Sequence, residues 1–266
     1  MKRIGSQLLS LAVCLAVGLG IAGCKKSAAP VSASEPSDGG AAASAVADSA
    51  DAQPAGSGVI CGKVFFDSAS PPPVMHSIDT KGLVACNHDH RQLLEEYAIV
   101  NSNKTLKNVL VYLKDAPAGG GGGTLPPVFL DQAHCQFVPH IVALRVGQRL
   151  VIRNSDDAMH NINGQARVNP AFNFAQAKVG DQATKIFKAA EIFSVTCDVH
   201  PWMKAYVGVF ANGYFALTGD DGTFAIANVP AGQYTLIAWH EHYGKLNQSV
   251  LAEDDKTTQA DLTYKE

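Results

Sequence analysis

From Gly58 onward the chain is a succession of short runs of β-branched and aromatic residues, each bounded by residues that favour turns. Few stretches repeat apolar residues at helical spacing, and the best helix candidate is Leu83 to Glu96. Many short strands separated by Gly, Pro and Asp turns predict an all-β fold of sandwich or barrel type. The clearest runs cover residues 58–67, 108–115, 140–147, 149–154, 192–197, 205–210 and 234–239.

The N-terminus predicts export from the cytoplasm. Lys2 and Arg3 precede an apolar stretch that is shorter than the roughly 20 residues needed to span a membrane, so residues 1–23 are expected to be a signal peptide. The end of that stretch, IAGC, resembles a bacterial lipobox, which implies cleavage before Cys24 and attachment of lipid to it. A plain signal peptide cut nearby and an uncleaved anchor remain open alternatives.

The lipobox resemblance implies a protein anchored by lipid on the periplasmic side of a bacterial membrane. Lys25 and Lys26 follow Cys24 where an Asp would favour retention in the inner membrane, so the outer membrane is favoured. Residues 24–57 consist almost entirely of small and polar residues and are expected to form a disordered tether. The formal net charge is −3 and the chain has no basic run, so nucleic acid is excluded as an expected partner.

A cluster of metal-binding residue types lies in the segment TCDVHPWMKAY, residues 196–206. Its spacing is Cys197-x-x-His200-x-x-Met203, and it lies between two predicted strands. Two His and one Cys in a plane, with a weak axial Met, form the blue-copper arrangement. The segment therefore supplies three of the four ligands of such a site, and a second His is needed from elsewhere.

Residues 137–162 supply that His within a recognisable pattern. Phe137-x-Pro139, Gly147, Asn154-x-Asp156 and His160-Asn161 resemble the cupredoxin family, and the Cys-x-x-His-x-x-Met spacing is similar to that of amicyanin and plastocyanin-like members. The resemblance covers roughly residues 127–210 and implies a Greek-key β-sandwich that binds one type 1 copper ion. It implies that Asn161 ties the ligand loops together by hydrogen bonding. The ligands that it carries over are His160, Cys197, His200 and Met203.

A lone type 1 copper has no open coordination position, so the resemblance implies single-electron transfer and no enzymatic activity. The expected partners are redox proteins such as a c-type cytochrome or an oxidoreductase. His200 resembles the ligand at the solvent edge, and Pro201 and Trp202 beside it are candidates for an apolar docking patch. Packing of these two residues as a lid over the copper is equally open.

Other interpretations of the Cys-His-Met loop remain. The three residues can be ordinary packing, Cys197 can belong to a disulfide, and zinc is a further alternative, although Met is a poor zinc ligand. A copper-binding or copper-delivery lipoprotein would use the same ligands without electron traffic. The loop lacks the second Cys of a binuclear copper centre.

The remaining cysteines are expected to be structural. Cys14 leaves with the signal peptide, and a disulfide between Cys86 and Cys135 would close a loop of about 50 residues, worth roughly 4 kcal/mol. The alternative is that Cys86 forms a second copper cluster with His88 and His90. Cys61 is then left as a buried strand thiol, a common state for Cys.

The segments on either side of the copper region resemble a second family. TGDDGTF and PAGQYTL, residues 218–224 and 230–236, are similar to carboxypeptidase regulatory-like (transthyretin-like) sandwiches, and GKV, PPP and VLVY in residues 62–64, 71–73 and 109–112 match the missing beginning. The resemblance implies a discontinuous sandwich made of residues 58–124 and 212–266, with the cupredoxin domain, residues 125–211, inserted. Two serial domains are the alternative.

This second family sometimes binds carbohydrate. Trp239, His240 and His242 are candidates for stacking on a glycan, although packing of Trp239 in the core is favoured. A carbohydrate-binding surface protein is therefore the third functional hypothesis, after the electron carrier and the copper-delivery lipoprotein.

Overall fold

The structure, a computed structural model, describes residues 56–69, 72–80, 83–86, 92–117 and 125–265. The predicted signal peptide, the lipidation site Cys24, the pair His88 and His90, and nearly all of the tether lie outside these residues. Within the described ranges no helix combines the length and apolar character needed to cross a membrane.

The first sandwich, here called the outer sandwich, consists of two four-stranded sheets in the described part of the chain. One sheet has the order β13-β1-β16, with β17 also paired to β1, and the other has the order β12-β2-β14-β15. Its strands are β1 (Gly58–Asp67), β2 (Leu110–Leu113), β12 (Phe215–Leu217), β13 (Thr223–Val229), β14 (Gly232–His240), β15 (Gly244–Ala252), β16 (Thr257–Gln259) and β17 (Leu262–Lys265).

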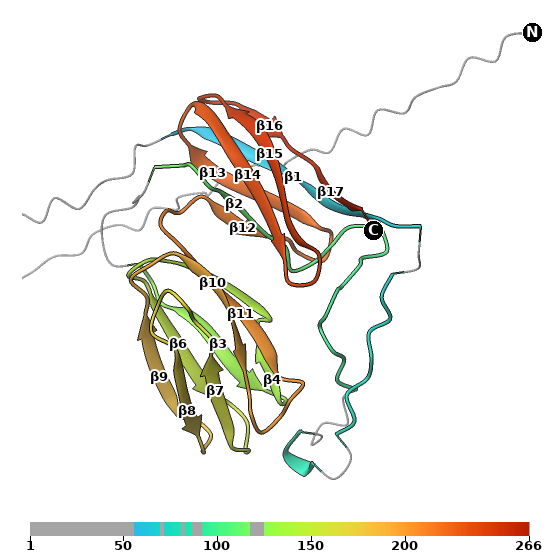
Figure 1. Cartoon of the computed structure of the whole chain (residues 1–266), viewed down its shortest axis with the longest axis vertical. Coiled ribbons are helices and arrows are strands. Elements are labelled where there is room, and N and C mark those ends of the chain that lie inside the picture. Colours follow the sequence, from blue (N-terminus) through green and yellow to red (C-terminus); the bar gives the residue numbers. More distant parts are fainter. Residues whose placement is uncertain (1–55, 70–71, 81–82, 87–91, 118–124, 266) are drawn as a thin grey trace, which may run out of the picture. The chain divides into compact units, whose positions relative to one another are not determined.

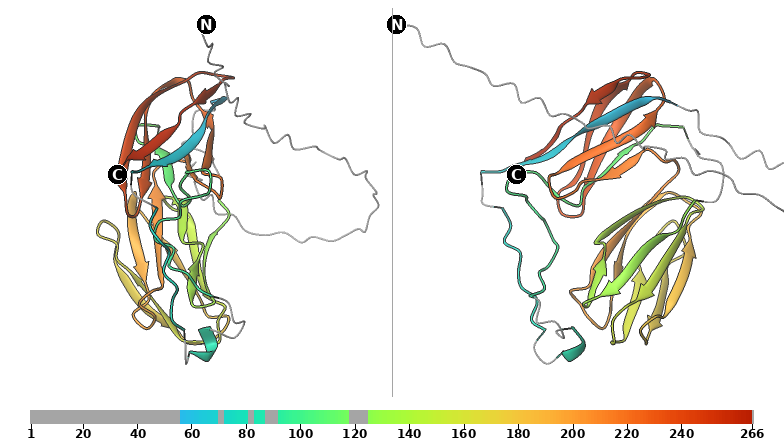
Figure 2. Two further views of the ribbon diagram at one scale, coloured as in Figure 1. Left: turned by 90° about the vertical axis from the view of Figure 1, so that its right-hand side faces the viewer. Right: turned by 180° about the vertical axis from the view of Figure 1, so that it is seen from behind.

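Each sheet of the outer sandwich combines strands from the two ends of the chain. β1 pairs antiparallel with β13 and parallel with β16 and β17, while β2 lies between β12 and β14. The blue β1 strand accordingly lies among the orange and red C-terminal strands in Figure 1, and it keeps that place in both views of Figure 2. Strands of both segments therefore share sheets.

The chain leaves the outer sandwich and returns to it at neighbouring positions. Tyr112 of β2 pairs with Phe215 of β12, and the Leu113 N–H donates to the Tyr214 carbonyl at 3.0 Å. The side-chain amide of Asn212 donates to the carbonyl of Ala116 at 3.3 Å. The two crossings between the sandwiches therefore lie side by side.

The second sandwich, here called the inner sandwich, has a four-stranded sheet β4-β3-β6-β9 and a five-stranded sheet β5-β11-β10-β7-β8. The pairs β3–β6 and β5–β11 are parallel, and the others are antiparallel. The all-β prediction of two β-sandwiches is therefore confirmed. The strands are β3 (Val128–Ala133), β4 (Gln136–Val138), β5 (Ile141–Arg145), β6 (Arg149–Asn154), β7 (His160–Gly164), β8 (Phe172–Gln176), β9 (Gln182–Ile186), β10 (Glu191–Thr196) and β11 (Lys204–Phe210).

Apolar side chains on alternate strand positions build a core in each sandwich. In β13, for example, Phe224 and Ile226 are buried while the residue between them is exposed. A third cluster, containing Leu110, Ile141 and Phe210, combines a β2 residue with residues of β5 and β11. Each buried large apolar side chain contributes about 1.5–3 kcal/mol, so this cluster holds the two sandwiches in one compact unit.

No α-helix forms over the described residues of the helix candidate, Leu83 to Glu96. Among them Val84–Cys86 forms a short 3₁₀ turn, η1, while Leu94 forms an antiparallel bridge with Ser77. The Ile78 N–H also donates to the carbonyl of Leu93 at 2.9 Å, and the Leu93 side chain is buried. Pairing across this loop satisfies backbone groups and buries an apolar residue at once, which outweighs the helical propensity of the segment. The described residues of 76–97 are called the arm below.

Candidate metal centre

The predicted ligands lie at one end of the inner sandwich, in the five-stranded sheet. His160 is the first residue of β7, and β7 pairs with β10 in the register that sets Asn163 opposite Thr196. Cys197 follows β10 directly, and Met203 directly precedes β11. Adjacent strands therefore deliver ligands from two distant parts of the sequence to one place.

The loop between β10 and β11 is closed by its own backbone. The Met203 N–H donates to the His200 carbonyl at 2.8 Å, and the Cys197 N–H donates to the Met203 carbonyl at 3.2 Å. These bonds fix the positions of all three candidate ligands relative to the strand ends. Met203 itself is buried in the same core cluster as Cys197.

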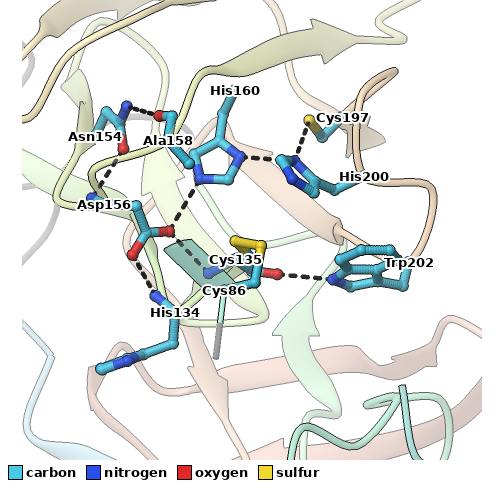
Figure 3. The surroundings of a disulfide bond; sticks show 10 residues. All are labelled: Cys86, His134, Cys135, Asn154, Asp156, Ala158, His160, Cys197, His200 and Trp202. Atoms are coloured by element: carbon cyan, nitrogen blue, oxygen red, sulfur yellow. Dashed lines mark hydrogen bonds and ion pairs between the residues drawn. A yellow bond between two sulfur atoms is a disulfide. The ribbon is translucent and has the colours of Figure 1, made fainter. Parts of the chain in front are cut away.

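Three of the four candidate ligands meet atom to atom. The Nδ1 atoms of His160 and His200 face each other at 3.0 Å, and the Cys197 Sγ lies 3.7 Å from the His200 Nδ1. The exposed fractions of their side chains are at most 6 %. Figure 3 shows the two rings pointing toward each other, with the thiol beside His200. Two imidazole nitrogens and one sulfur converge here on a site shielded from water.

An acidic residue that the sequence analysis did not assign orients His160. The Asp156 carboxylate accepts a hydrogen bond from His160 Nε2 at 2.9 Å and from the backbone N–H groups of His134 and Cys135 at 2.6 and 2.8 Å. Burial alone would raise the pKa of Asp156, but these bonds lower it. The available sequence signal was a carboxylate four residues before a candidate ligand His.

The bond to Asp156 determines the proton arrangement of His160. Because Nε2 donates to a carboxylate, the neutral ring presents the Nδ1 lone pair to His200. Burial by itself lowers the pKa of His160, yet the hydrogen bonds and charges of Asp156 and Cys197 outweigh it and raise the pKa to about 9. Burial and the neighbouring His160 lower the pKa of His200. The site therefore favours positive charge at its centre.

The thiol of Cys197 is prepared for deprotonation. Burial alone would raise its pKa, but the hydrogen bond with His160 and the backbone N–H groups of Asn161, His200 and Val199 lower it. Cys197 is also the free cysteine of the described residues. A thiolate is the form of Cys that binds metals, so these contacts favour a ligand.

Asn161 links the two ligand segments, in the role that the family resemblance implied. Its side-chain carbonyl accepts from the Asp198 N–H, and its amide donates to the Asp198 carboxylate and to Asn173, each at 2.8 Å. Asn163 and Asn173 donate to the same carboxylate at 3.0 and 2.9 Å. Hydrogen bonds from three asparagines lower the pKa of Asp198, which sequence reasoning had passed over although it follows Cys197.

The proposed docking residues differ in exposure. Pro201 is exposed, whereas the half-buried Trp202 packs its ring edge-on against His200 at 5.3 Å. The Trp202 indole N–H donates to the Cys135 carbonyl at 2.9 Å. Trp202 thus packs as a lid beside His200, the alternative that the sequence left open.

The disulfide expected between Cys86 and Cys135 is present and joins η1 of the arm to the turn between β3 and β4. Cys61 is buried, as expected. A free thiol and a disulfide sulfur occupy similar volumes, so burial alone does not distinguish them.

No protein-family model matches the chain, and no curated protein matches it. Similar solved structures include a copper-containing nitrite reductase from Thermus scotoductus SA-01, with 18% identity over 35% of this chain and 25% of that chain, at a TM-score of 0.31. A purple cupredoxin from Nitrosopumilus maritimus is 20% identical over 31% of this chain and 98% of its own (TM-score 0.27). An oxidised amicyanin variant is 22% identical over 31% and 81% (TM-score 0.29). This chain thus spans a quarter of the length of the nitrite reductase.

Proposed function

We propose that the chain is a cupredoxin-like carrier of single electrons that holds one type 1 copper ion. The supporting observation is the convergence of the His160 and His200 Nδ1 atoms with the Cys197 sulfur in a buried site. Two Nδ1 atoms facing each other at 3.0 Å share at most one proton, whereas a single metal ion satisfies both and the thiolate. Met203 is the proposed axial ligand.

The donor set fits copper. A thiolate and a thioether suit Cu(I), imidazole suits both oxidation states, and two His with one Cys and an axial Met is the donor set of blue-copper sites. Bound copper would supply a one-electron couple. The protein's part is to hold the ligands in one geometry in both oxidation states, which the Asp156 and Asn161 hydrogen bonds serve.

The same site argues for electron transfer and against an enzyme. All four proposed ligands are buried, and together they would fill the coordination positions of a type 1 copper ion, so no position is proposed for substrate. His200 lies between two exposed residues, Val199 and Pro201, so its ring edge is the proposed route for electrons. The proposed partner is a redox protein such as a c-type cytochrome, met on the periplasmic side of a membrane to which lipid on Cys24 anchors the chain.

The optical spectrum of the copper-loaded protein tests the proposal. We expect the intense visible absorption of a copper–thiolate bond, its loss in Cys197→Ser, and its retention in Ser194→Ala, a change on the same strand pair away from the ligands. A reversible one-electron couple should accompany it. Copper binding without this band, or without a reversible couple, would contradict the electron carrier and favour copper delivery.

A further inference from the structure

A second group of metal-binding side chains lies directly beside the first. A ring nitrogen of His200 and the two sulfurs of Cys86 and Cys135 lie within 4.8 Å of one another. The Cys135 sulfur also lies within 4.8 Å of ligand atoms of Asp156 and His160. In Figure 3 the His200 ring lies between Cys197 and the disulfide.

The surroundings of these sulfurs resemble those of the proposed copper ligands. The exposed fractions are 2 % for Cys86, 0 % for Cys135 and 6 % for His200. While the two sulfurs are bonded to each other, neither is a thiolate, and the thiolate is the form that binds metals. Reduction would convert the disulfide into two soft donors in a site that excludes water, which suits Cu(I).

We propose that Cys86 and Cys135 form a redox-gated Cu(I) site that opens when their disulfide is reduced, with their two thiolates as the ligands. Only the position of this site beside a type 1 copper ligand, His200, rests on the proposed function. The reductant is a dithiol: its two electrons and two protons cleave the S–S bond, and it becomes a disulfide itself. The two thiols of the chain then release their protons as Cu(I) binds.

The position of the disulfide permits this opening. Cys86 belongs to η1 and Cys135 to the turn between β3 and β4, so neither residue lies in a strand. Cys135 has a positive φ of 52°, as turn residues do. Its carbonyl is held by Trp202 and its N–H by Asp156, while Leu94 of the arm accepts a bond from Gln136 at 3.1 Å. The sulfurs can therefore separate to span a metal ion while the sheets and the neighbouring contacts persist.

The consequence for the protein is a second mode of handling copper. With the disulfide closed, the chain would hold one copper ion for electron transfer. With it open, the chain would hold a further Cu(I) ion on the Cys86 and Cys135 thiolates, beside His200. The redox state of the arm would thus set the copper content.

Anaerobic titration with Cu(I) against a chromophoric Cu(I) chelator tests the proposal. Oxidised protein, and protein reduced with a phosphine and then desalted, are compared with the variant Cys86→Ser/Cys135→Ser treated in the same way. We expect the gain of tightly bound Cu(I) on reduction to be one ion per chain larger in the wild type than in the variant. Copper taken up through Cys61 would appear in both and cancel.

The sulfur ligands per copper give a second readout on the wild type alone, which matters if the double variant does not fold. X-ray absorption should show this number rising when the second Cu(I) binds. Equal copper counts in wild type and variant, no rise in sulfur ligation, or a disulfide that phosphine cannot reduce in the folded protein would each overturn the proposal. Failure of the oxidised protein to bind copper would instead contradict the proposed function.

Discussion

Asp156 shows how one carboxylate can set the proton arrangement of a neighbouring candidate ligand, His160. Its carboxylate accepts hydrogen bonds from His160 Nε2 and from two backbone N–H groups. These bonds stabilise its negative charge, although the residue is only 4 % exposed. A carboxylate behind a metal-binding His fixes the tautomer and raises the basicity of the ligand. The residue therefore acts on the site through His160.

We predict that Asp156→Asn lowers copper affinity by about 10- to 100-fold, because loss of such a carboxylate typically has that effect. The neighbouring Asp157 is exposed, so Asp157→Asn is the matched control and should leave affinity unchanged. Competition with a chelator measures both. A ratio near one for Asp156→Asn would show that the carboxylate does not orient the ligand.

His240 is a second buried titratable residue, in the outer sandwich. It is 2 % exposed, and its Nδ1 accepts hydrogen bonds from the backbone N–H groups of His242 and Tyr243 at 3.1 and 3.4 Å. Burial, together with the charges of nearby histidines, lowers the pKa of His240 to about 4. The folded protein therefore holds this ring neutral where an unfolded chain would protonate it.

From this shift we predict a loss of stability in acid. As pH falls from 6.5 toward 4, the unfolded state binds the proton first, so His240 alone removes up to roughly 3 kcal/mol from the free energy of unfolding. Above pH 6.5 it contributes no pH dependence. Urea unfolding at pH 7 and pH 4.5 should show a smaller decrease in His240→Gln than in wild type. The exposed His76→Gln serves as control, and an equal decrease in all three proteins would contradict the assignment.

Residue spacing was enough to predict much of the site. The interval between Cys197, His200 and Met203 indicated a metal, and the distant His160-Asn161 pair indicated its type. The contact between Asp156 and His160 had a sequence signal, the spacing of four residues. The nearness of the disulfide to His200 had none, because it depends on how the turn between β3 and β4 folds back on the ligand end. Sequence spacing carries no information about that approach.

At the scale of elements, the β10–β11 loop forms the edge of the ligand end. Val199 is 46 % exposed beside His200, and Met159 is 51 % exposed beside His160. These two large apolar side chains lie next to buried candidate ligands. They form a surface from which a partner protein can displace water on binding. The exposed carboxylate of Asp198 borders it.

We predict that Val199→Asp slows electron transfer to a c-type cytochrome by about three- to tenfold, because a new charge at a contact changes the association rate. Val168→Asp introduces the same charge at a 67 % exposed position, at the far end of the β7–β8 hairpin, and should have little effect. Stopped-flow kinetics at fixed ionic strength compares them. Equal rates would place the contact elsewhere.

The arm shows the limit of sequence reasoning for elements. Periodicity from Leu83 to Glu96 suggested a helix, but cross-loop pairing and the disulfide at Cys86 determine the structure there. Such tertiary contacts override a weak local propensity. The strands were predicted more successfully, because alternation and turn residues are local signals.

At the scale of the whole molecule, the inner sandwich interrupts the outer one between adjacent strands. Because the crossings lie side by side at Ala116 and Asn212, we expect the outer sandwich to keep its sheets without the insert. Without the insert, Leu110 and Trp239 would lose apolar contacts with the inner sandwich. One of these is the contact of the Trp239 ring with Tyr206 of β11, at 5.1 Å between ring centroids.

We predict that deletion of residues 125–211, with residues 118–124 kept as a linker, gives a folded β-protein that unfolds cooperatively in urea. Since the chain contains two tryptophans, Trp239 is the only one left, and its fluorescence should shift to the red as it becomes exposed. A non-cooperative transition would contradict the independence of the outer sandwich. Leu110→Ser in the deletion protein serves to limit self-association through the uncovered face.

A split outer sandwich was predicted because the segments on either side of residues 125–211 each resemble part of one family pattern, and the domain boundaries stay a prediction. The join between the sandwiches was not, because Leu110, Ile141 and Phe210 are apolar strand residues like many others in the chain. An apolar residue in a strand is expected to be buried, but the sequence does not say which residue it packs against.

The adjoining crossings also determine the order in which the two sandwiches can fold during synthesis. During synthesis from the N-terminus, β1 and β2 emerge first but cannot pair until β12 to β17 follow. The inner sandwich, which lies between them in sequence, can finish folding in that interval. The outer sandwich therefore closes last, after the inner sandwich has folded. A nascent chain with a defective inner sandwich would be left with unpaired first strands, exposed to proteases and chaperones, before it is complete.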